Sequence, residues 1–292
     1  MKSLNNNIPT IKSFISKRII NLNKTIILIF ILSVSFTNLK SQHYKRIISL
    51  SPSLTINLYS LESKENLIGC TSYCEIAKPD KKEIVGTILE INIEKIIMLN
   101  PDLILATTLN NSKNIETLKN LGFKVEIFSS PHSFDEICQQ YIYLSEMLDK
   151  KDLAIKKIEE LRKQINNIKL LYINRQKKKF FFQIGVNPIF AVVPNTFMDE
   201  YITVCGGINI ANNLKGGTLT RETVINSNPD IIIITSMGLI GENEKKKWEQ
   251  CKTINAVKKN KIFFIDPNIA CVPTPETFVK SVEIISNFTK NE

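Results

Sequence analysis

Two stretches of this chain share one sequence pattern: NIEKIIMLNPDLILAT at residues 92–107 and TRETVINSNPDIIIIT at residues 220–235. In each stretch a polar residue is followed two positions later by a glutamate, and Asn-Pro-Asp begins six positions after that glutamate. Asn and Thr side chains cap the free amides of a helix start, and proline disfavours helical geometry in the residue before it. The apolar run that follows is typical of a strand buried on both faces of a parallel sheet. The pattern predicts one helix–turn–strand unit that occurs twice.

The spacing of the two copies predicts how the chain is organised. They lie 128 residues apart, which indicates two similar α/β lobes; the alternative is a chance likeness of two helix–turn–strand segments. Further apolar, β-rich runs predict strands at 46–50, 66–70, 102–106 and 124–128, and again at 180–185, 230–235 and 261–266. Helical stretches separate these runs, and such alternation favours parallel sheets with right-handed crossovers. The predicted fold class is therefore α/β.

A long helical region is predicted between the lobes. Ser133 and Glu136 form a capping box that opens a helix to about Leu148, and a second amphipathic helix is predicted from Lys151 to about Ile173. The apolar stripe of this second helix consists of Ile155, Ile158, Leu161, Ile165, Ile168 and Leu171. At about 1.5 Å per residue the helix spans over ~30 Å, and no flexible linker interrupts it. We predict an N-terminal lobe at 43–148, a rigid bridging helix at 149–176 and a C-terminal lobe at 177–292.

The first 42 residues carry much of the positive charge. They hold six basic residues and no acidic residue, so six of the ten positive charges of the chain lie there, and the remainder has 32 basic against 28 acidic residues, or +4. The short lysine runs at 177–179 and 245–247 are typical of solvated faces, so nucleic-acid binding is not expected. The apolar run at 25–36 is too short to span a bilayer and fits a secretory signal. We predict a signal peptide at 1–42 with an uncertain cleavage site and a periplasmic location; the alternative is an uncleaved anchor.

The six cysteines and two histidines do not form a recognisable catalytic or metal site. The cysteines are spread from residue 70 to residue 271, and none has the spacing of a zinc site. One or two structural disulfides are compatible with an oxidising compartment, but the sequence does not determine their pairing. A catalytic cysteine needs a base, and neither His43 nor His132 is well placed to provide one. We predict no catalytic residue, no protein-held metal and no cofactor.

Several motifs together resemble the periplasmic substrate-binding proteins of ABC importers for iron chelates and cobalamin, and the cobalamin-binding branch most of all. The resemblance extends from about Arg46 to Phe288. It is carried by RIISLSPSLT, GCTSYC, VGTILEINIEKIIMLNPDLILA, QIGVNPIF, CGGINIANN, LTRETVINSNPDIIII and Trp248. It implies two α/β lobes joined by one rigid helix, a monomer that captures a metal chelate between the lobes, and delivery of that chelate to a dimeric permease in the membrane.

The resemblance also implies roles for the two repeated glutamates. In the family, one glutamate at the tip of each lobe docks onto arginines of the permease, and the matching positions here are Glu94 and Glu222. One carboxylate per lobe suits a two-fold partner, because charge-assisted bonds to arginine set register and orientation. The alternative is that each glutamate only offsets the dipole of its own helix.

The ligand is expected between the lobes, near the carboxyl ends of the strands. The positions that match the family's cleft are Ser51, Pro52, Ser53, Tyr73, Cys74, Asn187, Pro188, Cys271 and Pro273. The chain departs from the cobalamin branch at Ile88, where that branch has a tryptophan, and at 270–276, where acidic, aromatic and arginine residues are replaced. The loops also lack the arginines with which siderophore binders hold anionic chelates. The ligand is therefore predicted only as a chelate of cobalamin, iron-siderophore or haem type.

The segment GCTSYC at 69–74 poses a separate question. We expect Cys70 to be buried and Tyr73 and Cys74 to face the cleft, with Cys271 on the opposite lip. Two such thiols could bind a soft metal, coordinate the metal centre of a ligand, form a disulfide or simply line the wall. A Cys70–Cys74 disulfide is a further alternative, and Cys205 is expected to be free. Two other functions stay open: an enzyme on the same bilobal scaffold, such as a chelatase, and a receptor for free metal ions.

Overall fold

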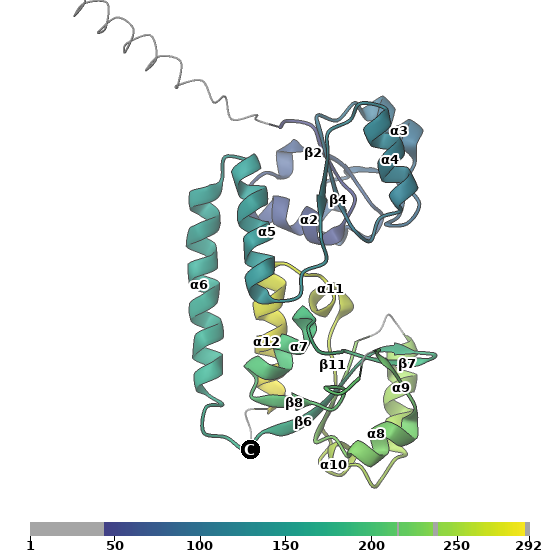
Figure 1. Ribbon diagram of the computed structural model, residues 1–292, viewed down its shortest axis with the longest axis vertical. Helices are drawn as coiled ribbons and strands as arrows, with labels where there is room; N and C mark the ends of the chain where they lie inside the picture. Colours follow the sequence, from purple (N-terminus) through teal and green to yellow (C-terminus); the bar gives the residue numbers. More distant parts are fainter. Residues whose placement is uncertain (1–43, 215, 236–238, 290–292) are drawn as a thin grey trace, which may run out of the picture. The chain divides into compact units, whose positions relative to one another are not determined.

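The structure is a computed structural model that describes residues 44–214, 216–235 and 239–289. The predicted signal peptide and its alternative, the anchor, lie outside the described residues, as does His43. Within the described ranges no helix is both long and apolar enough to cross a membrane. Residues 43–292 form one compact unit of the chain, and it contains two α/β lobes (Figure 1).

The first lobe is built on a fully parallel sheet. Its strand order is β3 (Glu83–Ile84), β2 (Leu67–Cys70), β1 (Ile47–Ser49), β4 (Leu103–Thr107) and β5 (Val125–Phe128). Helices α2 (Pro52–Ser60), α3 (Ile93–Leu99) and α4 (Ser112–Asn120) lie between the strands, with short 3-10 turns at Lys64–Asn66 and Glu75–Ala77. The four predicted strands are confirmed, whereas the two-residue edge strand β3 was not predicted.

The second lobe has a mixed sheet. Its order is β11 (Ile262–Phe264), β10 (Ile231–Ile234), β6 (Lys178–Val186), β7 (Ile189–Ala191) and β9 (Thr218–Leu219), and β8 (Gly207–Asn209) pairs with the start of β6. The predicted strands β6, β10 and β11 are parallel to one another, but β7 and β9 pair antiparallel. The helices of this lobe are α7 (Phe197–Val204), α8 (Arg221–Ser227), α9 (Leu239–Glu249), α10 (Asn255–Lys258) and α11 (Pro267–Ala270).

The repeated unit folds in the same way in both lobes. Asn92 and Thr220 cap helices α3 and α8 by accepting from the backbone N–H of Lys95 and of Thr223. Both helices end at an asparagine in the left-handed region, with φ of 44° at Asn100 and 47° at Asn228. Asparagine tolerates this conformation better than most residues with a side chain, which explains its use at the two helix ends.

The aspartate of each Asn-Pro-Asp ties its unit to the neighbouring strand. The Asp102 carboxylate accepts from the backbone N–H of Lys45 and Arg46 at 2.8 and 3.0 Å, just before β1. The Asp230 carboxylate accepts from the backbone N–H of Lys179 in β6 at 2.9 Å. The Arg46 and Lys179 side chains also donate to carbonyls at the ends of α3 and α8. The likeness of the two sequence stretches is therefore structural and not a chance one.

Each sheet buries two different faces, because alternate residues of a strand point in opposite directions. Ile48 and Ile104 pack with the buried side chains of α3 and α4, while Ile47 and Leu103 face the opposite way. In the second lobe Phe181, Ile232 and Ile234 pack with α8 and α9. The other faces of both sheets belong to one continuous apolar cluster that includes α5 (Phe134–Met147), α6 (Lys151–Leu170) and α12 (Pro275–Thr289).

The bridge between the lobes is a layer of three helices rather than one. Helix α6 ends at Leu170, three residues before the predicted end, and α5 and α12 pack beside it (Figure 1). Ile158, Ile165 and Ile168 of the predicted stripe are buried, but Ile155 and Leu171 are 37% and 43% exposed. The lobe boundaries predicted at 148 and 176 remain predictions, because helices of this layer contact both lobes.

Polar and aromatic contacts join the first part of the chain to its last helix. The Glu276 carboxylate of α12 accepts from the Ser60 hydroxyl at 2.6 Å and from the Lys157 ammonium at 3.1 Å. Phe278 of α12 packs against Phe134 and Tyr201, with ring centroids 4.7 and 4.8 Å apart. Burial of these large rings contributes most of the stability of such a junction.

Candidate functional site

A cluster of hydroxyl groups lies at the carboxyl end of β1 in the first lobe. Ser51 occupies the N-cap position of α2 without a side-chain capping bond, and its Oγ lies 3.0 Å from Oγ of Ser53. Ser49 and Thr55 bond to each other at 2.9 Å, and both donate to the carbonyl oxygen of Ser51. Ser51 and Ser53 are each only 8% exposed, next to Pro52, which begins the helix. The group offers hydroxyls and the positive end of a helix dipole to a polar or anionic ligand group.

Cys74 does not line a cleft, which corrects the orientation predicted from the sequence. It is 2% exposed, and its Sγ lies 3.1 Å from the Thr55 hydroxyl and 3.3 Å from the Thr71 hydroxyl. The bend after β2 turns its side chain toward α2 instead of toward solvent. A metal or disulfide shared between Cys74 and Cys271 is therefore excluded in this conformation.

Cys70 and Cys74 are both free and share a hydrogen bond inside the first lobe. This hydrogen bond, with further ones from Thr55 and Thr71, lowers the pKa of the Cys74 thiol against the cost of burial. The same hydrogen bond and burial raise the pKa of Cys70. The Cys70–Cys74 disulfide is not formed, and Cys70 is buried as predicted.

Tyr73 is the exposed member of the GCTSYC segment, with 47% of its surface accessible. It lies in a turn in which the backbone N–H of Cys74 donates to the carbonyl of Thr71 at 3.1 Å. Burial of Cys74 on one side of the turn leaves the neighbouring tyrosine on the other side. Its ring is available for contact with an apolar or aromatic ligand face.

In the second lobe the predicted residues follow the carboxyl ends of the parallel strands. Asn187 and Pro188 form the exposed tip of the β6–β7 hairpin and are joined by a cis peptide bond. Gly185 allows this hairpin to close, because a Cβ there would lie 2.8 Å from Cβ of Phe190. Cys271 is exposed and lies 3.9 Å from the hydroxyl of Thr235, which follows β10.

Pro273 is half-buried in the turn between α11 and α12. The turn is held by the Thr274 and Thr277 hydroxyls, 2.9 Å apart, and by the bond from Thr277 to the Val272 carbonyl. The carboxyl end of each sheet thus carries several of the predicted cleft residues. Among these the structure brings Ser51 and Ser53 together, and it separates Cys74 from the rest by burial.

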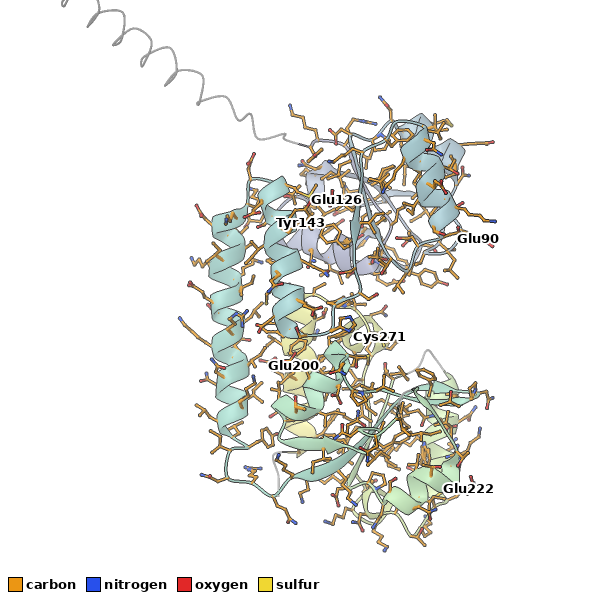
Figure 2. All side chains as sticks on the ribbon, in the orientation of Figure 1. Glu90, Glu126, Tyr143, Glu200, Glu222 and Cys271 are labelled. Atoms are coloured by element: carbon orange, nitrogen blue, oxygen red, sulfur yellow. The ribbon has the colours of Figure 1, made fainter. Side chains whose placement is uncertain are left out.

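The two predicted docking glutamates occupy the same position in α3 and α8. Glu94 and Glu222 are both exposed and are the second residues of their helices. Hydrogen bonds from the Glu222 backbone N–H and from the Thr220 hydroxyl lower the pKa of Glu222. Figure 2 shows Glu222 on the outer side of the second lobe, away from Cys271.

A buried polar network next to Glu222 was not predicted. The Glu244 carboxylate is fully buried and accepts from Arg221 at 2.6 Å and from Gln183 at 3.2 Å. The Arg221 guanidinium lies 4.0 Å over the Trp248 ring, whose indole N–H donates to Gln183 at 2.7 Å. Burial raises the pKa of Glu244, but the hydrogen bonds from Arg221 and Gln183 outweigh it and lower the pKa overall.

This network links helix α8, which carries Glu222, to the strand that ends at the predicted ligand loop. Arg221 begins α8, Glu244 and Trp248 lie on α9, and Gln183 lies in β6 four residues before Asn187. The partners are 23 and 61 residues away from Glu244 in the chain. From the sequence, the motifs that contain Gln183 and Arg221 and the single tryptophan pointed to this region, but nothing pointed to the buried Glu244.

Among the described residues, no group of three or more His, Cys, Asp or Glu side chains could hold a metal ion. The hydroxyls of Ser51 and Ser53, the ring of Tyr73 and the amide of Asn187 are suited to binding a large solute by hydrogen bonds and stacking.

Comparison with known proteins agrees with this architecture. The family model described as "Periplasmic binding protein" matches residues 47–269. The chain belongs to this family. A curated relative, the vitamin B12-binding protein of Yersinia pestis (strain Pestoides F), is 28% identical over 238 residues, which is 80% of this chain and 85% of the relative.

Solved structures of the periplasmic binding protein family share the fold. The periplasmic vitamin B12-binding protein BtuF of Vibrio cholerae has a TM-score of 0.72 at 25% identity, covering 85% of this chain and 97% of that one. The apo form of the periplasmic heme-binding protein RhuT from Roseiflexus sp. RS-1 has a TM-score of 0.74 at 20% identity, with 85% and 98% covered. The predicted fold class and family are confirmed.

Proposed function

We propose that this chain is the solute-binding component of an ABC importer. It captures a metal chelate of cobalamin or haem type between its two lobes and delivers it to a permease dimer in the membrane. The observation that carries this proposal is the matched pair of exposed glutamates, Glu94 and Glu222, on equivalent helices of a periplasmic binding protein. In this function the chain performs no chemistry of its own.

The paired glutamates support a two-fold partner. Each stands on a helix that is fixed at both ends, by the capping residue and by the left-handed asparagine, so its position is rigid. A helix dipole alone would favour an acidic residue anywhere in the first turn. The use of one exposed position in both lobes instead favours docking onto two equivalent basic sites, as on a permease dimer.

The ligand class rests on the relatives and on the side chains available. The curated relative is named for vitamin B12, and the solved relatives for vitamin B12 and heme. Ser51, Ser53 and Asn187 can bond to the polar rim of such a molecule, and Tyr73 can stack on its ring face. Cys271 is exposed, so its sulfur is a candidate axial ligand for the metal centre of a chelate.

The ligand is tested on protein isolated from its own host and from cells supplied with cyanocobalamin, haem or a ferric siderophore. Native mass spectrometry and an absorption spectrum identify any chelate that co-purifies, and isothermal titration calorimetry measures its affinity. We expect submicromolar binding of one of the three. Binding of none of them, with steady turnover of a chelate substrate, would favour the enzyme alternative.

Docking is tested with the double variant Glu94→Gln/Glu222→Gln. We expect the chelate affinity to be unchanged and the affinity for the reconstituted permease to fall roughly a hundredfold or more, since two charge-assisted bonds are lost. The matched control is Glu159→Gln/Glu283→Gln, which removes the same charge from exposed positions on α6 and α12. Equal permease binding by both double variants would overturn the docking assignment while leaving the ligand assignment intact.

A further inference from the structure

The end of α6 carries a segment with an unusual composition. Residues 169–179 read KLLYINRQKKK, with five cationic side chains, and the chain contains no acidic residue from Leu161 to Met198. The lysine run at 245–247 differs, because Lys245 and Lys247 lie 4.0 and 3.5 Å from carboxylates of α9. The positive charge of residues 169–179 is therefore not offset by any acidic residue within 161–198.

The apolar side chains of this segment point outward because its tyrosine is fixed inward. The Tyr172 hydroxyl lies 3.0 Å from Oγ of Ser286 on α12. Its neighbours are left at the surface, with Leu170 65%, Leu171 43% and Ile173 67% exposed. Single exposed leucines are common on protein surfaces, but three large apolar side chains within four positions form a local apolar cluster.

The start of the second sheet continues the same surface. Lys179 of β6 is the register partner of Ile208 in β8, and both side chains are exposed. Ile208 is 40% exposed. Residues 169–179 together with Ile208 are called the α6-end patch below. It combines a row of cations with four exposed apolar side chains.

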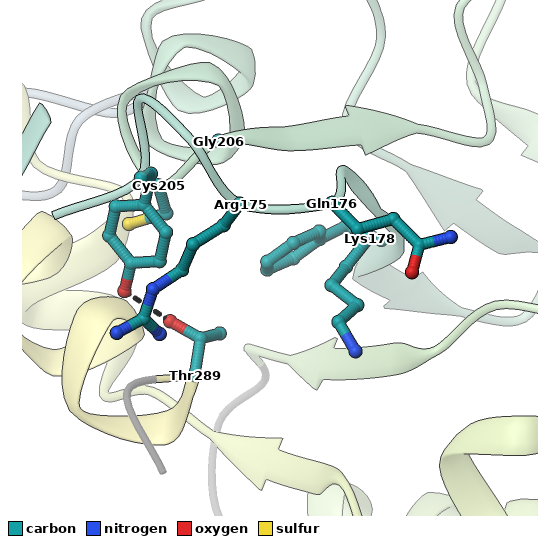
Figure 3. A pocket seen from close by; sticks show the side chains of 8 residues that line it. Arg175, Gln176, Lys178, Cys205, Gly206 and Thr289 are labelled. Carbon is teal, nitrogen blue, oxygen red and sulfur yellow. Dashed lines mark hydrogen bonds between the residues drawn. The ribbon is translucent and has the colours of Figure 1, made fainter. Parts of the chain in front are cut away.

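A cavity of about 220 Å³ opens in this patch (Figure 3). Tyr172 and Phe180 supply aromatic walls, and Arg175, Gln176 and Lys178 supply polar groups. It lies at the start of β6, whereas the predicted ligand loop at Asn187 follows the end of that strand. The cavity is therefore at the opposite end of the sheet from the proposed chelate site.

We propose that the α6-end patch binds the surface of an anionic lipid membrane, with a lipid phosphate at the rim of the cavity. Lysine and arginine side chains are attracted to anionic headgroups, and exposed leucine and isoleucine side chains insert at the level of the acyl boundary. A soluble polyanion would use the cations but gain nothing from the apolar side chains, which favours the lipid surface. Figure 1 shows the end of α6 apart from α3 and α8, so the patch is separate from the docking glutamates.

The test is flotation of the processed protein with vesicles of phosphatidylcholine, with and without phosphatidylglycerol. We expect binding only to the phosphatidylglycerol vesicles, weakening as salt is added. Lys169→Gln/Lys177→Gln should lower the partition coefficient roughly tenfold or more, given the contribution of each charge near the surface. The matched control is Lys246→Gln/Lys247→Gln, which should bind as the unmodified protein does. All variants keep the same N-terminus, so a retained anchor cannot account for a difference between them.

A second pair of variants tests the apolar component. Leu170→Ser/Ile173→Ser should lower binding roughly tenfold, and the control Leu109→Ser/Leu121→Ser, at exposed positions of the first lobe, should not. Equal vesicle binding by all four variants would overturn the proposal. The proposal would also be overturned if only the lysine variant lost vesicle binding and the protein bound heparin. That outcome would indicate a general polyanion-binding surface instead of a membrane-binding one. Because permease binding is measured separately, neither result bears on the docking glutamates.

Discussion

Asn100 and Asn228 hold a backbone conformation that is unfavourable for most residues with a side chain. Their φ values of 44° and 47° end the two repeated helices and turn the chain into the buried strands. At Asn228 the side chain has a further role, since its Oδ1 accepts from the backbone N–H of Asn255 at 2.8 Å. Asparagine thus adopts the left-handed backbone conformation in both lobes, and in the second lobe its side chain also makes a hydrogen bond.

Asn100→Ala should lower the free energy of unfolding by about 1 kcal/mol, because alanine is penalised in the left-handed region. Asn100→Gly should be close to neutral, since glycine adopts that region freely. Chemical unfolding followed by circular dichroism measures both. An equal loss with glycine and alanine would mean that the asparagine side chain, and not the backbone conformation, accounts for the residue.

Glu244→Gln should lower stability at neutral pH by about 3 kcal/mol, because it leaves the Arg221 charge without its buried partner. The pKa of Glu244 in the folded protein lies below its ordinary value of 4.5, so its ionised form adds stability above that pH. This added stability is lost as the pH falls through the folded pKa. The difference between the two proteins should therefore shrink in acid.

Urea unfolding at neutral pH and at pH values below 4.5 tests this dependence. The control is Glu242→Gln, two residues earlier on α9 at an exposed position. The control should follow the unmodified protein at every pH. A Glu244→Gln deficit that stays constant from neutral to acid pH would show that packing, and not charge, accounts for it.

At the scale of secondary-structure elements, the helix–turn–strand units are predictable because their determinants are local. Caps, prolines and apolar runs lie within sixteen residues, and the structure forms both units as expected. The antiparallel strands β7 and β9 were missed because they are short: β7 pairs with β6 across the hairpin at Asn187, and β9 pairs with β7 from a distant part of the chain. The α12 helix joins the bridging layer through contacts with α5 and α6 that are distant in the sequence.

The candidate site was less predictable than the fold. The positions of Ser51, Tyr73 and Asn187 at strand ends follow from the strand assignments. The burial of Cys74 depends instead on Thr55, nineteen residues earlier, which no local pattern reveals. The Glu244 network also depends on partners far away in the chain, so a lysine- and glutamate-rich helix concealed a buried carboxylate.

The aspartates of the two units should contribute equally and independently. Asp102→Ala removes the acceptor for two backbone amides, and Asp230→Ala removes the acceptor for Lys179 and for the Asn255 side chain. We expect each to cost about 1–2 kcal/mol of unfolding free energy. The double variant should lose the sum within about 0.5 kcal/mol, because the sites lie in different lobes. Chemical unfolding of the three variants measures this, and a strongly non-additive loss would mean that the two units are coupled.

At the scale of the whole compact unit, contacts across the helical layer limit how far the lobes can move. The backbone N–H of Phe134 donates to the Glu200 carboxylate at 2.7 Å, and the His132 ring bonds to the Asn195 carbonyl at 2.9 Å. The buried apolar cluster is continuous through α5, α6 and α12. A wide hinge opening would have to break this packing.

We therefore expect the radius of gyration to change by less than about 1 Å when a chelate binds, because packed helices shift by small amounts instead of hinging. Small-angle X-ray scattering on the free and loaded protein measures this. Glu200→Ala removes one of the contacts and should enlarge the change without abolishing binding. A change of several ångströms in the unmodified protein would contradict a stiff bridge.

The single tryptophan has a practical consequence. Trp248 is enclosed in the second lobe, under Arg221 and bonded to Gln183, so its emission is that of one fixed indole in one environment. A corrin or a haem absorbs light at the wavelengths where indole emits. Resonance energy transfer would then dim Trp248 when such a pigment is carried, even though the ring never touches it. A colourless cargo would leave the emission bright, so the protein contains its own optical test for the chemical nature of what it transports.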